Sequence, residues 1–267
     1  MIKTDIIIPT WEGNVKNELK NSLNSILGEI TFINKIFLVI DGCKKFPVNL
    51  SISNSLKNKI IIIYLYKNYG PGYARNIGVF FSKAENIIFL DNGDKCSKNR
   101  IKTQINTLNE YEISVGHIKE IKKNRKASIR FSAKNIINAK RLLPYRTPFN
   151  NVTIAIKRKN FLELKGYPKL RTAEDWLFMG KVIKNNLKLF CENIVLVEIE
   201  KDELFISRRR GKHVLKDINF CINELKEMGL LNNYEKFISI NIQKILRLYT
   251  PNKILEILFF LLRKNIK

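Results

Sequence analysis

The sequence predicts an α/β fold in which helices flank an open, mostly parallel sheet, followed by a helical C-terminal extension. Two patterns predict this fold. Short apolar runs alternate with segments of helical periodicity through the first half, which is typical of βαβ units. Clusters of Gly, Pro, Asn and Asp follow the apolar runs, where loops are expected. Composition agrees, because 45% of the 267 residues are apolar, which excludes a disordered chain and a disulfide-rich miniprotein.

The elements of the first half follow from periodicity. The apolar runs predict strands at 5–8, 36–40, 60–66 and 87–90. Apolar residues at helical spacing predict helices at 15–27, 72–83 and 99–111. Ligands of an open α/β sheet bind beyond the carboxyl ends of its strands. The informative loops are therefore 9–14, 41–44, 68–75 and 91–94.

The second half is less regular up to residue 207 and helical beyond it. We expect a strand at 151–156 and helices at 159–164 and 174–184. Three more helices are expected at 211–228, 232–249 and 253–263, the last after Pro251, which resets the chain direction. The chain thus divides into a ligand-binding α/β domain over 1–207 and a basic amphipathic extension over 208–267.

The formal charge is +24, from 48 Lys and Arg against 24 Asp and Glu. Such a surplus is typical of proteins that bind nucleic acid, anionic lipid or phosphate-bearing small molecules. A Lys-, Asn- and Ile-rich composition gives the same surplus without any polyanion, and this alternative stays open. A nucleic-acid-binding protein is the less favoured interpretation, because the basic residues are spread along the chain and no nucleic-acid-binding signature appears.

The four cysteines show no C-x-x-C pairing and only two histidines are present, so a zinc site is not expected. We expect reduced thiols. The first predicted strand begins without a signal-peptide pattern, and no run reaches the roughly 20 apolar residues that span a bilayer. These features predict a protein on the cytoplasmic side.

Two acids follow the apolar run IIFL in the segment LDNGD. Asp91 and Asp94, at a strand end and separated by small residues, can hold a divalent cation whose other ligands are phosphate oxygens. The alternative is an Asn-Gly turn with solvated acids.

A Gly-containing loop, YGPGYARN, opens the helix predicted at 72–83. Gly70 and Gly72 allow the backbone to approach a ligand, and Arg75 in the first turns can meet a phosphate or a sugar. An ordinary loop-to-helix junction is the alternative.

Adjacent acids, Glu174 and Asp175, begin the helix predicted at 174–184. Neighbouring helical residues diverge by about 100°, so only one of the two faces a given site. Partial desolvation near Trp176 would make a carboxylate a better proton acceptor. The alternative is that both acids complement the helix dipole.

The order of these segments resembles the family 2 glycosyltransferases, which bind nucleotide sugars with the GT-A fold, a Rossmann-like open sheet. The segments are DIIIPTWEGN, FLVIDGC, NYGPGYARNIG, IIFLDNGD, and GY followed by AEDW, and they cover about residues 4 to 200. The longer stretches FLDNGDKCSKNRIKTQINTL, RTPFNNVTIAIKRKNFLELKGY and SRRRGKHVLKDI look like bacterial enzymes that build capsule, exopolysaccharide or O-antigen.

The resemblance implies a role for each matching residue. On the nucleotide side, Pro9, Thr10 and Glu12 would wrap the base and ribose, and Asp41 would contact the uracil of a UDP-sugar. Arg75 matches a basic residue on the nucleotide side, and Gly70 and Arg75 would belong to the nucleotide-sugar-binding residues. Ile40 stands where the family commonly has a further acid, so the contact to the base depends on Asp41.

On the reaction side, the resemblance implies that Asp91 and Asp94 hold Mg²⁺ or Mn²⁺. Gly93 occupies the third place of the family's D-x-D-D pattern, so Asp94 is the favoured ligand. Asp175 would be the general base of an inverting transfer, with Glu174 the weaker candidate. A basic segment containing Arg208 and Arg210 would neutralise the leaving diphosphate.

The expected reaction is transfer of a sugar from a UDP-sugar to a hydroxyl of a glycan on a lipid diphosphate carrier. The expected location is the inner face of the bacterial cytoplasmic membrane. The apolar run ILEILFFLL, followed by RKNIK, suits an interfacial helix on an anionic membrane surface, and packing against the domain is the equal alternative. A nucleotidyltransferase or another nucleotide-binding α/β enzyme is the alternative function.

Overall fold

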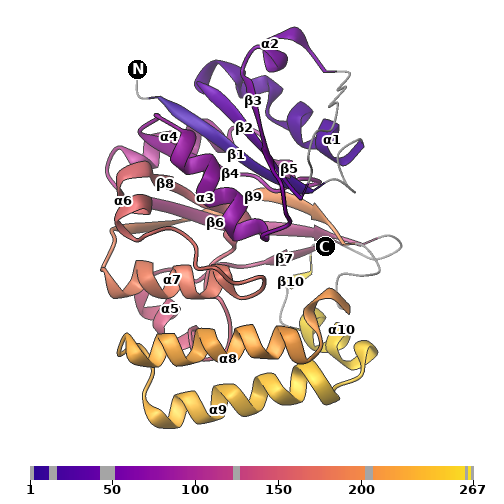
Figure 1. The fold of residues 1–267 in the computed structure, drawn as a ribbon, viewed down its shortest axis with the longest axis vertical. Helices are drawn as coiled ribbons and strands as arrows, with labels where there is room; N and C mark the ends of the chain where they lie inside the picture. The colour runs from indigo at the N-terminus through magenta and orange to yellow at the C-terminus, as the bar shows by residue number, and fades with distance from the viewer. Residues whose placement is uncertain are drawn as a thin grey trace.

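A ten-stranded sheet forms the centre of the structure, a computed structural model that describes residues 3–11, 17–42, 52–122, 127–201, 207–261 and 264–265. Its strands are β1 (Thr4–Trp11), β2 (Lys35–Asp41), β3 (Ile60–Leu65), β4 (Asn86–Phe89), β5 (Lys95–Cys96), β6 (Ile113–Ile121), β7 (Ser128–Arg130), β8 (Ala155–Lys157), β9 (Leu189–Glu200) and β10 (Lys264–Asn265). Figure 1 shows the sheet crossing the molecule with helices packed around it.

The first half forms the parallel part of the sheet. Strands β3, β2, β1 and β4 lie side by side and parallel, which places their carboxyl ends at one edge. Strand β8 joins antiparallel to β4, and β6 pairs with β8, β7 and β9, the last of these in parallel. The predicted α/β class with a mostly parallel sheet is confirmed, and the four strands predicted in the first half match β1 to β4 within three residues.

Ten α-helices are found in the described part of the chain. They are α1 (Asn17–Ser25), α2 (Asn54–Lys57), α3 (Pro71–Phe81), α4 (Arg100–Leu108), α5 (Ile136–Leu142), α6 (Arg158–Glu163), α7 (Glu174–Lys184), α8 (Lys212–Glu227), α9 (Asn233–Lys244) and α10 (Asn252–Leu261). A π-helical turn, Ile245–Tyr249, continues α9. Local signals set several ends: Pro71 begins α3, and an Asn232–Glu235 capping box begins α9.

Alternate residues of the central strands enter two separate cores. Ile7, Phe37 and Phe89 face the core shared with α3, α6, α7 and α8. Ile6 and Ile8 face the other core, with α1 and α4. This period of two is what a strand covered on both faces requires.

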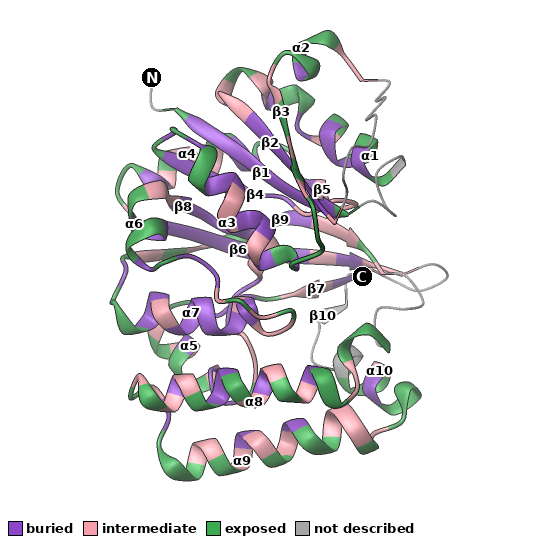
Figure 2. Ribbon diagram, in the orientation of Figure 1, coloured by how far each residue is buried: buried purple, intermediate pink, exposed green. Residues whose placement is uncertain are grey.

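The C-terminal helices form the far layer of the first core. Helix α8 buries Val214, Ile218, Cys221, Ile222 and Leu225 against it, and α9 packs on α8. Figure 2 shows α7 largely buried, whereas α9 and α10 carry many exposed positions.

The sequence-based assignment is wrong at one strand and incomplete elsewhere. Residues 151–153, predicted as strand, form a 3₁₀ turn in which the Thr153 hydroxyl donates to the Asn150 carbonyl at 2.7 Å, and the strand β8 begins only at Ala155. The pattern also missed β6, β9 and α5. Strand β6 includes Gly116, His117 and Glu120, whose polar groups obscure a buried strand.

Candidate functional site

The carboxyl ends of β1, β2 and β4 gather predicted residues at one edge of the sheet. The register pairs Thr10 with Ile40 and Trp11 with Asp41 across β1 and β2. Two residues after Phe89, the last residue of β4, lies Asp91, and the next residue, Asn92, donates to the Thr10 hydroxyl at 2.8 Å. The structure therefore joins the first loop and the acidic turn, two segments far apart in sequence.

Asp41 organises the loop that precedes α3. Its Oδ1 accepts from the Tyr69 amide at 2.8 Å, and its Oδ2 accepts from the Gly70 amide at 2.7 Å. Gly70 has φ of +98°, which a residue with a side chain rarely adopts. Burial raises the pKa of Asp41, although the two amides and Arg171 oppose that rise. Contact of Asp41 with a nucleotide base stays a prediction.

Arg75 lies at the centre of a buried cluster of charged and polar groups. Its Nη2 donates to Asp91 Oδ1 at 2.6 Å, and its Nη1 lies 3.5 Å from Glu174 Oε1. Its guanidinium also lies over the Tyr167 ring, 5.4 Å from the centroid. Burial alone would lower the pKa of Arg75, but Asp91, Tyr167 and Glu174 outweigh it, so the guanidinium stays charged. Arg75 thereby connects the acidic turn to the start of α7.

The two acids at the start of α7 differ in environment. Glu174 is buried, and burial together with neighbouring Asp175 raises its pKa to about 8, with Arg75 opposing. At 3.5 Å the contact to Arg75 is too long for a strong charge-assisted hydrogen bond, so burial dominates and Glu174 is largely protonated at neutral pH. Asp175 is half-buried and accepts from the Trp176 amide at 2.8 Å. Of the two, Asp175 is the acid that solvent or a substrate can reach.

The acidic turn holds two carboxylates near each other. The Asp94 amide donates to the Asp91 carbonyl at 3.1 Å, and Gly93, with φ of +94°, donates to the Ser22 hydroxyl at 2.9 Å. Burial and the charge of Asp91 raise the pKa of Asp94 well above its usual value. A cation would relieve that repulsion, and carboxylate oxygens are what Mg²⁺ and Mn²⁺ prefer. The donor set therefore fits a divalent ion completed by phosphate oxygens.

The possible metal ligands in this turn are two carboxylates, those of Asp91 and Asp94. Within the described ranges, no group of three or more His, Cys, Asp or Glu side chains could hold a metal ion by itself. Two acids and a bound diphosphate are the arrangement that remains, since Mg²⁺ in proteins is commonly bound by one or two carboxylates plus substrate phosphates.

Three residues that sequence analysis did not assign hold the cluster together. The Asn76 side chain donates to the Tyr167 carbonyl and accepts from the Tyr167 amide, both at 2.8 Å, which links α3 to the segment before α7. The Asn151 amide fits best with its oxygen toward Arg75, 3.2 Å from both Nη atoms, and its nitrogen toward the Tyr167 hydroxyl. Asn76 and Tyr167 lie within the quoted ARN and GY segments, so those motifs contained the signal.

Helix α8 contributes Asp217, also unassigned from sequence. Its Oδ2 accepts from the Arg171 amide, the Thr172 amide and the Thr172 hydroxyl at 3.1 to 3.2 Å. Arg171 in turn donates to the Asn68 carbonyl at 2.9 Å. One carboxylate from the C-terminal helices thus fixes the loop that leads into Glu174 and Asp175.

The remaining predicted residues lie apart from this cluster or outside the described ranges. Pro9 is buried within β1, and Glu12 is not among the described residues. Arg208 lies exposed in a 3₁₀ turn. Arg210 donates to Asn252 Oδ1 at 2.6 Å and to the Arg247 and Leu248 carbonyls at 3.4 Å, which ties it to the end of α9. Diphosphate contact by these arginines stays a prediction.

Comparison with known proteins identifies the class and then the family. The crystal structure of Staphylococcus aureus TarS residues 1–349 in complex with UDP-GlcNAc matches with a TM-score of 0.66 at 19% identity, covering 91% of this chain and 73% of that one. The chain therefore has the predicted GT-A fold of glycosyltransferases. A family model described as glycosyl transferase family 2 matches residues 5–164, which is more than half of the chain, and the chain belongs to that family.

Relatives in sequence agree. An uncharacterized glycosyltransferase of Haemophilus influenzae (strain KW20) is 25% identical over 207 residues, which is 74% of this chain and 76% of the relative. Poly(ribitol-phosphate) β-N-acetylglucosaminyltransferase TarS of S. aureus (strain MW2) is 27% identical over 222 residues, 80% of this chain. The aligned part spans only 37% of TarS. The predicted membership in family 2 is confirmed.

Proposed function

We propose that the protein is an inverting glycosyltransferase that moves a sugar from a UDP-sugar to a hydroxyl of a lipid-diphosphate-linked glycan. The observation that carries this proposal is the chain of contacts from Asp91 through Arg75 to Glu174. This chain sets the acidic turn and the reachable carboxylate of Asp175 in fixed relation at the carboxyl edge of a GT-A sheet. Such an arrangement suits a donor diphosphate on one side and an acceptor hydroxyl on the other.

Asp175 is proposed as the general base. A sugar hydroxyl is a poor nucleophile, and a carboxylate that accepts its proton as the new bond forms makes attack on the anomeric carbon feasible. Attack from the face opposite the diphosphate inverts the configuration of that carbon. Glu174 is proposed to position Arg75 and the start of α7, because its carboxyl is buried.

Asp91 and Asp94 are the residues that would hold Mg²⁺ or Mn²⁺. A divalent ion bound there would supply charge stabilisation to the departing diphosphate. Arg75 keeps Asp91 oriented through the 2.6 Å contact, and Gly93 allows the tight turn that brings Asp94 back toward Asp91.

UDP-GlcNAc is the donor proposed for first trial, because the TarS structure with the same fold holds it. The proposed setting is the assembly of a bacterial surface polysaccharide such as capsule, exopolysaccharide or O-antigen, at the cytoplasmic face of the membrane. The surplus of basic residues suits two phosphate-bearing substrates, a nucleotide sugar and a lipid diphosphate.

The test combines ligand binding with turnover. UDP-GlcNAc with Mn²⁺ should raise the unfolding temperature by several degrees, since ligand at about 100 times its Kd adds roughly 2.7 kcal/mol of stability. Slow release of UDP from the donor in water should also be measurable. Asp175→Asn should abolish transfer and keep the donor-induced shift, whereas Glu227→Gln, an exposed acid on α8, should change neither.

Two results would count against the proposal. A flat screen of UDP-, GDP- and dTDP-sugars with and without Mn²⁺ would contradict nucleotide-sugar binding. Consumption of a nucleoside triphosphate and a sugar phosphate with release of pyrophosphate would identify a nucleotidyltransferase instead.

A further inference from the structure

Helix α9 turns two polar side chains toward the protein and two aromatic side chains toward solvent. Ser239 and Gln243 are buried and donate to the carbonyls of Pro144 and Tyr145 in the segment after α5. Tyr234 and Phe237, on the other side of the helix, are 73% and 65% exposed. A helix at the surface of a soluble domain normally has the reverse arrangement. The outer face of α9 therefore exposes two aromatic side chains beside the polar residues Asn233, Asn241 and Lys244.

The apolar face continues through the π-helical turn into α10. Ile245 and Tyr249 are exposed on the turn, and Tyr249 is 67% exposed. In α10, Ile254, Ile257, Leu258 and Leu261 are exposed at the i, i+3, i+4, i+7 spacing of one helical face.

Among the described side chains of α10, those of Asn252, Leu255 and Glu256 contact the rest of the protein. Leu255 is buried, and Glu256 accepts from Lys122 at 3.0 Å. Ile254, Ile257, Leu258 and Leu261 are exposed on another side of the helix. Contiguous exposed apolar surface of this kind marks an interaction site.

Basic residues outnumber acidic residues around this apolar face. Residues 229–265 contain six Lys and Arg and only two acids. Both acids are engaged, Glu235 in the cap of α9 and Glu256 with Lys122, while Lys244 and Lys253 are exposed. A second copy of the chain would bring the same positive charge against itself, whereas an anionic bilayer is complementary both to the apolar face and to its basic border.

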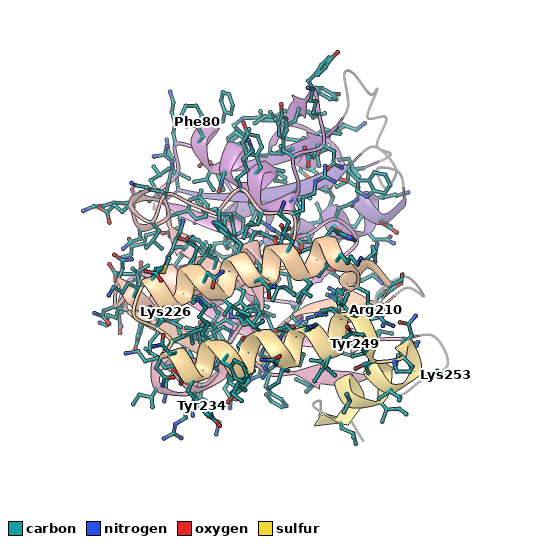
Figure 3. All side chains as sticks on the ribbon, turned by 60° about the horizontal axis from the view of Figure 1, so that its bottom comes forward. Phe80, Arg210, Lys226, Tyr234, Tyr249 and Lys253 are labelled. Carbon is teal, nitrogen blue, oxygen red and sulfur yellow. The ribbon has the colours of Figure 1, made fainter. Side chains whose placement is uncertain are left out.

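Contacts of Arg210 fix the position of the apolar face of α10 relative to α8. Arg210 binds Asn252 and the carbonyls at the end of α9, so α10 is held close to the start of α8. Figure 1 shows α10 on the side of the molecule toward which β1 and β2 run, and Figure 3 shows α8, α9 and α10 together on the surface turned toward the viewer.

We propose that the exposed faces of α9, the π-helical turn and α10 form a docking surface for an anionic lipid bilayer. Tyr234, Phe237 and Tyr249 enter the boundary between headgroups and acyl chains, and Lys244 and Lys253 meet lipid phosphates. The surface lies on the membrane and does not cross it; among the residues that the structure describes, no helix is long and apolar enough to span a bilayer.

The test is sedimentation of the full-length protein with vesicles of phosphatidylcholine alone or mixed with phosphatidylglycerol. The wild type should bind the mixed vesicles, bind pure phosphatidylcholine weakly, and lose affinity as salt is raised. The triple variant Phe237→Ser, Tyr249→Ser, Ile257→Ser should bind at least about tenfold more weakly. Its circular dichroism and unfolding temperature should match the wild type, because all three side chains are exposed.

The control is Phe80→Ser. Phe80 is 69% exposed on α3, next to the exposed Phe81, and Figure 3 places it at the end of the molecule away from Tyr234 and Tyr249. Phe80→Ser should bind the mixed vesicles like the wild type. A second variant, Lys244→Glu with Lys253→Glu, should lose the preference for phosphatidylglycerol and keep the apolar surface.

Equal binding by the wild type and the triple variant, or no binding of the wild type to the mixed vesicles, would overturn the proposal. A concentration-dependent dimer in sedimentation velocity that the triple variant abolishes would show that a second copy covers this face instead. The assay needs no donor or acceptor, so its outcome is independent of the proposed transfer reaction.

Discussion

Replacing Glu174 with Gln tests whether the buried carboxyl is protonated at neutral pH. The wild-type carboxyl has its pKa raised from 4.5 to about 8 by burial and by Asp175. An acid with a raised pKa in the folded state binds more protons folded than unfolded between those two values, so the wild type loses stability as pH rises from 4.5 to about 8. Below 4.5 both states are protonated and the group contributes no pH dependence.

The magnitude follows from the two pKa values. A rise from 4.5 to about 8 corresponds to at most roughly 5 kcal/mol, since one pKa unit is about 1.4 kcal/mol. Gln has nearly the same shape and cannot ionise, so the variant lacks this loss. The stability of Glu174→Gln relative to the wild type should therefore increase by a few kcal/mol between pH 5 and pH 8.5, or several degrees in unfolding temperature at about 2 to 4 °C per kcal/mol.

The assay is thermal or urea unfolding of both proteins across this pH range, with a chelator present so that bound metal does not enter the comparison. Glu227→Gln is the matched control, because Glu227 is exposed on α8 and should follow the wild type at every pH. Parallel curves for Glu174→Gln and the wild type would refute the reasoning. They would mean that Arg75 at 3.5 Å keeps Glu174 ionised in spite of its burial.

Three further substitutions probe the scaffold of the site. Gly72→Ala should cost about 1 to 3 kcal/mol in thermal unfolding and lower kcat, because the new methyl would lie 2.7 Å from the Glu174 Cγ atom where α3 meets α7. Asn76→Ala should cost about 2 to 4 kcal/mol, because it leaves the backbone amide and carbonyl of Tyr167 without partners, and unfolding curves would show an unchanged midpoint if the link is unimportant. Asp217→Asn weakens the acceptor for three hydrogen bonds before α7, and kinetics should show a larger fall in kcat than change in donor KM.

The first half of the fold could be predicted because its strands can be recognised from consecutive residues alone. Strands β1, β2 and β4 are largely buried on both faces, so they appear as continuous apolar runs between loops rich in Gly and Asn. Strand β3 is also an apolar run, but it lies at the edge of the sheet and is partly exposed. In the second half, β6 and β9 bury polar side chains. His117 accepts from the Ser132 amide at 3.3 Å, and Glu192 accepts from Thr107 and Ser114. These partners come from distant segments, so the sequence pattern cannot show that such polar residues are buried.

In the site, too, features that depend on local sequence could be predicted and features that depend on distant contacts could not. The acids at strand and helix ends could be found, because strand order and loop position predict them. The family resemblance already favoured Asp175 over Glu174, but the difference between their environments could not be predicted. The two acids are neighbours in sequence, and only packing around Gly72 and Tyr167 makes Glu174 buried and leaves Asp175 reachable. Asn151 and Asp217 lie within the quoted stretches RTPFNNVTIAIKRKNFLELKGY and SRRRGKHVLKDI, but nothing in those stretches indicates that their side chains reach the cluster.

Helix α8 lies beyond residue 207, where the sequence predicts that the chain divides. Its buried side chains nevertheless belong to the hydrophobic core that contains α7; they are Val214, Ile218, Cys221, Ile222 and Leu225. Burying an aliphatic side chain contributes about 1.5 to 3 kcal/mol, so the four aliphatic residues alone contribute on the order of 10 kcal/mol, comparable to the net stability of a whole domain. Asp217 on the same helix fixes the loop before Asp175, and α9 packs on its outer side. Helix α8 is thus shared structure, and it fixes the proposed membrane face of α9 relative to the acids of the site.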